Sequence, residues 1–178
     1  MGIVKKLKLL WIDSIHPSNK KKIKYLESEG AVIGNGTRFN CKIRSLGTEP
    51  YLIRIGENCL LATDIHLITH DGAIKVLNSL GKFENNMDKM GPVIIGNNVY
   101  IGMGAYVMPN VHIGDNSIIG AGAIVTKDIP ANSVAVGIPA RVICSIEDYY
   151  NKCKDSLDDL SGMDQNKKRD YLINKYMK

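Results

Sequence analysis

A six-residue period of aliphatic side chains dominates the middle of the chain. The aliphatic series is Ile95, Ile101, Val107, Ile113, Ile119 and Val125. A small or aliphatic residue follows each of them four positions later, and glycine directly follows four of them. This spacing fits neither the 3.6-residue period of a helix nor the two-residue period of a strand. A fixed short period instead predicts stacked units, each of which covers the core of the next.

Three consecutive hexads, or eighteen residues, make one turn of a three-sided parallel β-helix. Complete turns are predicted at 55–72, 95–112 and 113–130, with looser turns at 33–54 and 131–142. Asn and Asp tolerate the left-handed backbone conformation that sharp corners use. The polar pairs Asn97–Asn98 and Asp115–Asn116 are therefore expected at corners.

The period divides the chain into three predicted parts, and the fold class is mainly β. Residues 1–30 form a basic segment with a short N-terminal helix, residues 31–143 the β-helix, and residues 144–178 a helical cap. The cap is expected to hold helices at 146–153 and 164–178, because the open end of a solenoid needs a cover.

An inserted loop at 73–94 interrupts the β-helix shortly after a histidine. Loops of this length without a repeat of their own are uncommon in compact domains and are typically functional or disordered. The insertion is therefore either an active-site flap or a tolerated excursion.

Charge and composition limit the classes of partner. The 178-residue chain has a net charge of +5, and its lysines cluster at positions 5, 6 and 8 and again between 20 and 24. These clusters are either solvated faces or a surface that attracts anions, which leaves peripheral membrane contact open. Aromatic and arginine residues are not interleaved with them, which argues against a nucleic-acid partner.

The cysteines and the N-terminus indicate a cytoplasmic protein. Four isolated cysteines form no CxxC pair, so neither a disulfide framework nor a zinc site is expected. The apolar run at 9–12 is too short to span a bilayer, and no signal-peptide pattern is found. A transmembrane segment is therefore not expected.

Residues 94–130 and 136–142 closely resemble the hexapeptide-repeat acyltransferases, and the resemblance extends over residues 31–143. It implies a left-handed parallel β-helix, which is an exception to the right-handed crossover rule. It also implies a homotrimer that binds acetyl-CoA in clefts between subunits.

Within that family, residues 68–72 look like the O-acetyltransferases of capsule, O-antigen and related surface polysaccharides. Two features differ from the maltose and galactoside acetyltransferases. The chain has His70-Asp71 in place of their His-Pro pair, and its insertion before the next hexad is longer. The sugar-binding positions of those relatives therefore do not carry over directly.

His70 is the candidate general base, because a neutral imidazole accepts a proton at cellular pH. The alternative is a hydrogen-bonded corner histidine. Asp71 and Asp64 are candidates to orient the ring, although each also suits a corner turn. His66 and His112 take the last place of their hexads and are expected on a wall or the surface.

The resemblance assigns the oxyanion donor and the acetyl-CoA contacts. The backbone N–H of Met103 is the expected oxyanion donor, and flanking glycines allow close approach of a thioester. The expected cofactor-binding residues are Gly102, Ala121, Thr126, Lys127 and Arg141. Lys and Arg suit phosphate groups, but Cys144 stands where galactoside-type relatives have a second arginine.

Tyr100 and Asn40 match acceptor-contacting positions of relatives, and Asp71 is a further candidate contact. Tyr100 is a candidate for stacking on a sugar face, or else for wall packing. Asn40 is either an acceptor contact or a corner residue.

The sequence thus predicts an acetyl-CoA-dependent O-acetyltransferase that acts on a saccharide hydroxyl by direct transfer, with no metal required. One alternative keeps the chemistry but uses an amino sugar, serine or an antibiotic as acceptor. Another is a zinc enzyme like the γ-type carbonic anhydrases, for which His66, His70 and His112 suffice in number but not in spacing. A third is a non-catalytic scaffold.

Overall fold

The computed structural model describes Leu7 and residues 18–178. The lysine cluster at positions 5, 6 and 8, on which the predicted membrane contact partly rests, lies outside the described residues. The apolar run at 9–12 and His16, the fourth histidine of the sequence, also lie outside the described residues.

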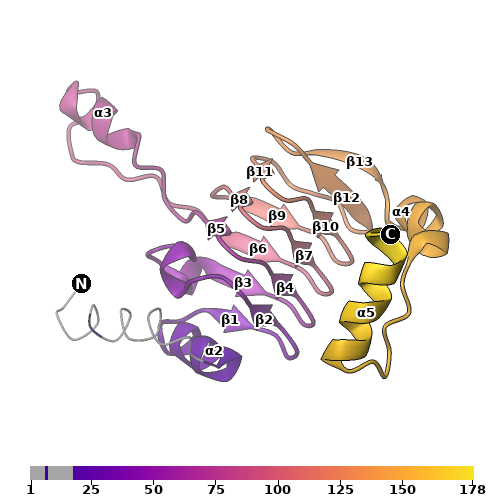
Figure 1. The fold of residues 1–178 in the computed structure, drawn as a ribbon. Helices are drawn as coiled ribbons and strands as arrows, with labels where there is room; N and C mark the ends of the chain where they lie inside the picture. The colour runs from indigo at the N-terminus through magenta and orange to yellow at the C-terminus, as the bar shows by residue number, and fades with distance from the viewer. Residues whose placement is uncertain (1–6, 8–17) are drawn as a thin grey trace.

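Three sheets of short strands form the sides of a prism (Figure 1). Sheet A contains β1 (Val32–Ile33), β3 (Ile53–Ile55), β6 (Val93–Ile95) and β9 (Val111–Ile113). Sheet B contains β2 (Arg38–Phe39), β4 (Leu60–Leu61), β7 (Tyr100–Ile101), β10 (Ile118–Ile119), β12 (Ser133–Val136) and β13 (Arg141–Ser145). Sheet C contains β5 (His66–Leu67), β8 (Tyr106–Val107) and β11 (Ile124–Val125). All pairings are parallel except that of β12 with β13, so the described chain forms a parallel β-helix.

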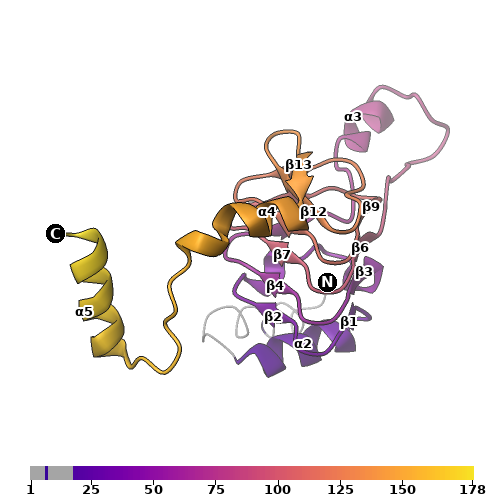
Figure 2. The ribbon, with the colours of Figure 1, turned by 90° about the vertical axis from the view of Figure 1, so that its right-hand side faces the viewer.

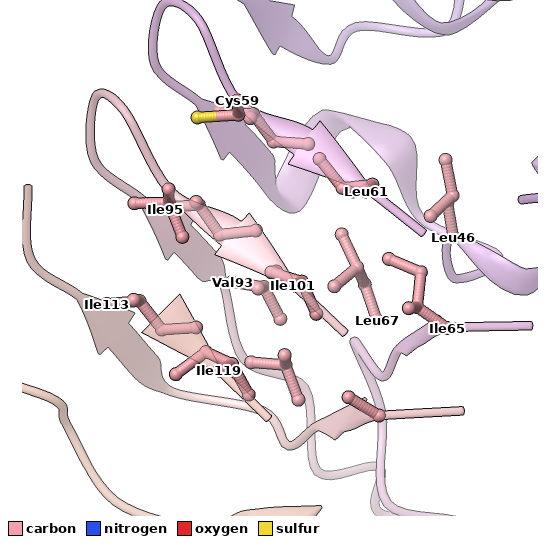
Figure 3. Packing of buried hydrophobic residues seen from close by; sticks show 14 of the residues in the cluster. Leu46, Cys59, Leu61, Ile65, Leu67, Val93, Ile95, Ile101, Ile113 and Ile119 are labelled. Carbon is pink, nitrogen blue, oxygen red and sulfur yellow. The ribbon is translucent and has the colours of Figure 1, made fainter. Parts of the chain in front are cut away.

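The core is a column of aliphatic side chains inside the prism. Figure 3 shows Ile95, Ile101, Ile113 and Ile119 stacked in successive coils, and each is 2% exposed or less. The six-residue period therefore marks inward-facing positions. The predicted corners are also found, since Asn98 and Asn116 have positive φ and their side chains are hydrogen-bonded to each other at 2.9 Å.

Three departures from the eighteen-residue repeat fall at one corner, where sheet C leads into sheet A. Ile95 pairs with Ile113, eighteen positions on, but Val32 pairs with Arg54, twenty-two positions on. Ile55 pairs with Ile95 across the insertion. The last coil is shorter than predicted, because Ile113 bridges to Ile129 after sixteen positions. We call this edge the C/A corner. The edge where sheet B leads into sheet C is the B/C corner. Its length is the same in the three coils that pass from β4 to β5, from β7 to β8 and from β10 to β11.

Helices lie at both ends of the prism. Helix α2 (Asn19–Ser28) packs against β1 and β2 and buries Tyr25 and Leu26. Helix α4 (Ile146–Cys153) contacts β12 and β13 and begins with a capping box between Ser145 and Asp148. Helix α5 (Gln165–Tyr176) stands away from the sheets instead of covering the prism (Figure 2). Short 3₁₀ turns are η1 (Ile43–Ser45), η2 (Pro50–Leu52) and η3 (Lys154–Ser156).

The insertion leaves the prism as an arm, defined as residues 71–90, which carries helix α3 (Ile74–Ser79) (Figure 1). Its two stems pair at the base, where His70 forms an antiparallel bridge with Met90 and the Gly91 amide donates to Thr69. Among the described residues, no helix is long and apolar enough to cross a membrane.

Candidate active site

His70 lies at the C/A corner, at the base of the arm. Its backbone is fixed by the bridge to Met90, and the next amide, of Asp71, donates to the carbonyl of Lys89. The His70 side chain is 48% exposed. The arm and the histidine are therefore built on one local backbone arrangement.

A glutamate holds one side of the His70 ring. Oε2 of Glu49 lies 3.2 Å from Nδ1 of His70, and Oγ1 of Thr48 lies at the same distance from that nitrogen. The Thr69 hydroxyl donates to Oε2 at 2.5 Å, and the Thr48 hydroxyl donates to Oε1 at 2.6 Å. The Glu49 side chain is only 14% exposed.

The hydrogen bonds decide the charge of Glu49 and the tautomer of His70. Burial raises the pKa of Glu49, but hydrogen bonds from Thr48, Thr69 and His70 outweigh it, so the pKa is lowered overall. An ionised carboxylate only accepts hydrogen bonds, so Nδ1 of His70 must carry the proton that it donates. Nε2 then holds the free lone pair, and it makes no hydrogen bond to any residue that the structure describes.

Glycine at position 47 lets Glu49 reach the histidine. Gly47 has φ of 75°, and a Cβ at that position would lie 2.7 Å from Oγ1 of Thr69. The segment that carries Glu49 therefore packs directly on the coil that carries His70. A side chain at position 47 would strain the backbone and separate the two coils.

The two orienting residues proposed from the sequence are not the ones found. Asp64 is a corner residue with φ of 54°. The Asp71 carboxylate accepts from the Ala73 amide at 3.0 Å and from Lys89 at 3.3 Å, and these contacts lower its pKa. Asp71 therefore stabilises the base of the arm, and Glu49 holds the ring.

His70 borders a cleft of about 640 Å³ whose other lining residues all belong to the arm. Its walls are His70, Asp71, Gly72, Lys75, Asn78, Ser79, Asn86, Met87, Asp88 and Lys89. The volume is within the range of roughly 300–1,000 Å³ that is usual for small-molecule sites. Nine of these ten residues are polar, charged or glycine.

The predicted oxyanion donor lies at the B/C corner. Met103 is 56% exposed, and its amide makes no hydrogen bond within the part of the chain that the structure describes. Its carbonyl accepts from Gly122 at 2.8 Å, and Gly104 has positive φ. The Met103 N–H is therefore available to a ligand at the surface.

Four of the predicted cofactor-binding residues divide between the same two corners, and the fifth lies on a strand of sheet B. Gly102 and Ala121 stack at the B/C corner, where a Cβ on Gly102 would lie 2.5 Å from the Ala121 amide. Thr126 and Lys127 are exposed at the C/A corner, two coils beyond His70. Arg141 begins β13, opposite Val136.

Tyr100 and Asn40 do not line the cleft that contains His70. Tyr100 is 40% exposed on the outer face of sheet B, and Asn40 follows β2 at the start of the B/C corner. Of the three predicted acceptor contacts, only Asp71 is brought beside His70 within one chain.

The remaining histidines have other surroundings. The His66 ring is stacked on Tyr106, with centroids 4.5 Å apart on sheet C. His112 lies on sheet A, exposed. Within the described chain, no group of three or more His, Cys, Asp or Glu residues could hold a metal ion.

Comparisons with known proteins agree with this architecture. Residues 92–127 match the family described as bacterial transferase hexapeptide (six repeats). Protein CapG of Staphylococcus aureus is 43% identical over 148 residues, which cover 83% of this chain and 84% of that protein.

Two solved structures are similar over most of the chain. A maltose O-acetyltransferase from Clostridium difficile 630 has a TM-score of 0.57 at 31% identity, with 79% of this chain and 83% of that chain covered. A galactoside acetyltransferase in complex with coenzyme A has a TM-score of 0.57 at 27% identity, with 82% and 80% covered.

Proposed function

Because the chain belongs to the hexapeptide-repeat acyltransferase family, we propose that it transfers an acetyl group from acetyl-CoA to a hydroxyl of a saccharide. The observation that carries this proposal is the His70 ring beside a polar cleft: Glu49 holds its Nδ1, and no residue that the structure describes bonds to its Nε2. The saccharide belongs to a capsule, an O-antigen or a related glycan. The prism is a left-handed β-helix, as the hexapeptide repeat of residues 92–127 implies.

In this mechanism Nε2 of His70 removes the proton of the attacking hydroxyl, and the oxygen attacks the thioester carbonyl directly. The Met103 N–H donates to the oxyanion that forms. The carbonyl then re-forms, coenzyme A leaves as the thiol after protonation, and the acetyl ester remains on the sugar. No acyl-enzyme is needed. Glu49 stabilises the imidazolium while His70 holds the proton.

Acetyl-CoA fits residues at both corners. The Met103 amide, which has no partner among the described residues, and the neighbouring Gly102 and Ala121 suit the thioester and pantetheine arm. Lys127 and Arg141 supply positive charge for the phosphates of the nucleotide end.

Two observations support a homotrimer whose sites form between subunits. His70 and Met103 occupy different corners of one prism, so a second copy must bring a B/C corner to a C/A corner. In addition, the arm turns large apolar side chains outward: Val76, Leu77, Leu80 and Phe83 are between 38% and 63% exposed. A neighbouring subunit would cover them.

A thiol-release assay with acetyl-CoA and a panel of saccharides tests the activity. Thiol release that depends on the saccharide, with an O-acetyl ester in the NMR spectrum of the product, is the expected result. Serine, amino-sugar and chloramphenicol acceptors form the comparison panel. Release with only these, or an N-acetyl product, would contradict the proposal.

Mixing two inactive variants tests the composite site. His70→Ala and Met103→Pro chains each spoil one half of the site. When they are unfolded and refolded together in equal amounts, a site with both halves intact forms with a probability of one half times one half, or roughly a quarter. Recovery of about that fraction of activity is expected. No recovery, with mixed oligomers present, would place both residues in the same chain's site.

A further inference from the structure

The arm turns its polar side chains toward the cleft and its apolar side chains toward the outside. On α3, Lys75, Asn78 and Ser79 lie three and four positions apart, share one face and line the cleft. Val76 and Leu77 lie on the other side of the helix and are exposed, as is Leu80 directly after its last residue. An excursion that only needed to be packed away would turn its apolar face toward the protein.

The polar residues of the cleft fall into two groups. The first group holds the arm in shape. Asn78 makes two hydrogen bonds with the backbone of Met87, at 2.8 and 3.0 Å, and Asp71 pairs with Lys89 at 3.3 Å. These contacts tie α3 and the returning stem together and fix the width of the cleft.

The side chains of the second group do not hold the arm in shape. The side chains of Lys75, Ser79, Asn86 and Asp88 make no hydrogen bond or ion pair with any residue that the structure describes, although all four line the cleft. They present an ammonium, a hydroxyl, an amide and a carboxylate to the space opposite His70. A sugar hydroxyl both donates and accepts hydrogen bonds, so this mixture of donors and acceptors suits it.

The cleft is balanced in charge. Lys75 and Lys89 carry two positive charges, and Asp71 and Asp88 carry two negative charges. An anionic ligand would meet a carboxylate as well as each ammonium. A neutral ligand with several hydroxyls meets partners of both kinds.

We propose that the arm forms the acceptor subsite, in which a neutral polyhydroxylated saccharide lies between His70 and α3 and is held by hydrogen bonds to Lys75 and Asp88. This inference rests on the proposed transfer to a saccharide. It assigns acceptor recognition to residues of the insertion, whereas the prism carries the acetyl-CoA contacts.

The test uses 4-nitrophenyl β-galactopyranoside as the neutral probe and the corresponding galacturonide as the anionic probe. Binding is followed by saturation-transfer NMR and turnover by thiol release. Lys75→Ala and Asp88→Asn are expected to weaken binding of the neutral probe, and to raise its KM, about five- to fiftyfold. The KM for acetyl-CoA and its slow hydrolysis without sugar should stay close to wild type.

Lys82→Ala and Glu84→Gln are matched controls, because both residues are exposed on the same arm but do not line the cleft. They should change neither probe's binding. Equal effects of cleft and control variants, or unchanged affinity in Lys75→Ala and Asp88→Asn, would overturn the subsite. Tighter binding of the galacturonide would overturn its neutral class.

The outcomes also separate the subsite from the activity. Suppose that the wild type binds the neutral probe, that the cleft variants do not, and that the wild type releases no thiol. This result would support the subsite and refute the transfer. Thiol release that is insensitive to Lys75 and Asp88 would keep the transfer and refute the subsite. Neither binding nor release of either probe would refute both.

Discussion

Oε2 of Glu49 lies 3.2 Å from Nδ1 of His70, although the two residues belong to successive coils. Strands β3, β4 and β5 lie between them in the chain. The contact has a chemical consequence. It gives His70 a single tautomer and places a negative charge next to the imidazolium that forms when the ring takes a proton.

Removing the Glu49 carboxylate should slow the reaction without weakening acetyl-CoA binding. A hydrogen bond to a charged group is worth roughly 1.5–3 kcal/mol, so Glu49→Ala should lower kcat about 10- to 100-fold. Glu49→Gln keeps an acceptor for Nδ1 but loses the charge. The kcat of Glu49→Gln should therefore lie between those of Glu49→Ala and the wild type. Wild-type kcat in both variants would mean that Glu49 has no part in the reaction.

His70→Ala should lower kcat about 10²- to 10⁴-fold, the usual size of a general-base effect. The matched control is His112→Ala, because His112 is exposed on sheet A away from the cleft. The control should stay near wild type, and sedimentation should show the same oligomer for all three proteins. Full turnover in the His70 variant with a true acceptor would refute the assignment.

The fold was predictable because a β-helix repeats one local rule. Inward aliphatic residues such as Ile101 and Ile119 and left-handed corners such as Asn98 leave a periodic trace in the sequence. The segments outside the six-residue repeat were harder to predict from the sequence. Helix α5 was expected to cap the prism, but its placement away from the sheets depends on the path of the preceding chain, which no periodicity records.

Glu49 was missed because the first coil is longer than the repeat. A strict eighteen-residue step back from His70 reaches Leu52, whereas the observed pairing of Val32 with Arg54 shows a twenty-two-residue coil. The four extra residues lie at the C/A corner and bring Thr48 and Glu49 beside the ring. Allowing insertions at the corner where the arm already occurs would have identified the glutamate. The sequence offered Asp71 and Asp64 as the carboxylates near His70, although each also suits a corner turn.

The Met103 prediction separates the backbone from the side chain. Proline has no N–H, so Met103→Pro should lower kcat about 10²- to 10³-fold, the usual loss for one oxyanion-hole donor. Met103→Ala keeps the N–H and should retain nearly full activity. Thermal unfolding of both variants controls for damage to the B/C corner. Equal activity of the two variants would exclude the amide from the reaction.

Lys127→Ala should raise the KM for acetyl-CoA about three- to tenfold, since an exposed lysine contributes one charged contact to a phosphate. The same variant should use acetyl-pantetheine, which lacks the nucleotide, as well as the wild type does. Lys168→Ala, on α5, is the control for loss of a surface charge. An unchanged KM for acetyl-CoA would contradict the assigned place of Lys127.

Asp158 joins the C-terminal helix to the segment before it. Its carboxylate accepts hydrogen bonds from Lys175 at 2.5 Å, Tyr176 at 2.6 Å and Tyr171 at 2.8 Å. These contacts, led by that of Lys175, lower the pKa of Asp158 to about 2. A lowered pKa means that the attachment is complete above the ordinary value of 3.8 and is lost as the pH falls from there through about 2.

Acidification should therefore release α5 before the prism unfolds. The NMR ring signals of Tyr171 and Tyr176 should shift as the pH falls from about 4 toward 2, because a protonated Asp158 no longer accepts three hydrogen bonds. Asp158→Asn should show the shifted signals already at pH 7. Asp159→Asn is the control, since that neighbouring carboxylate accepts hydrogen bonds from Ser161 instead. If Asp158→Asn kept the wild-type tyrosine signals at neutral pH, the cluster would not hold the helix, and α5 would owe its position to contacts other than this carboxylate.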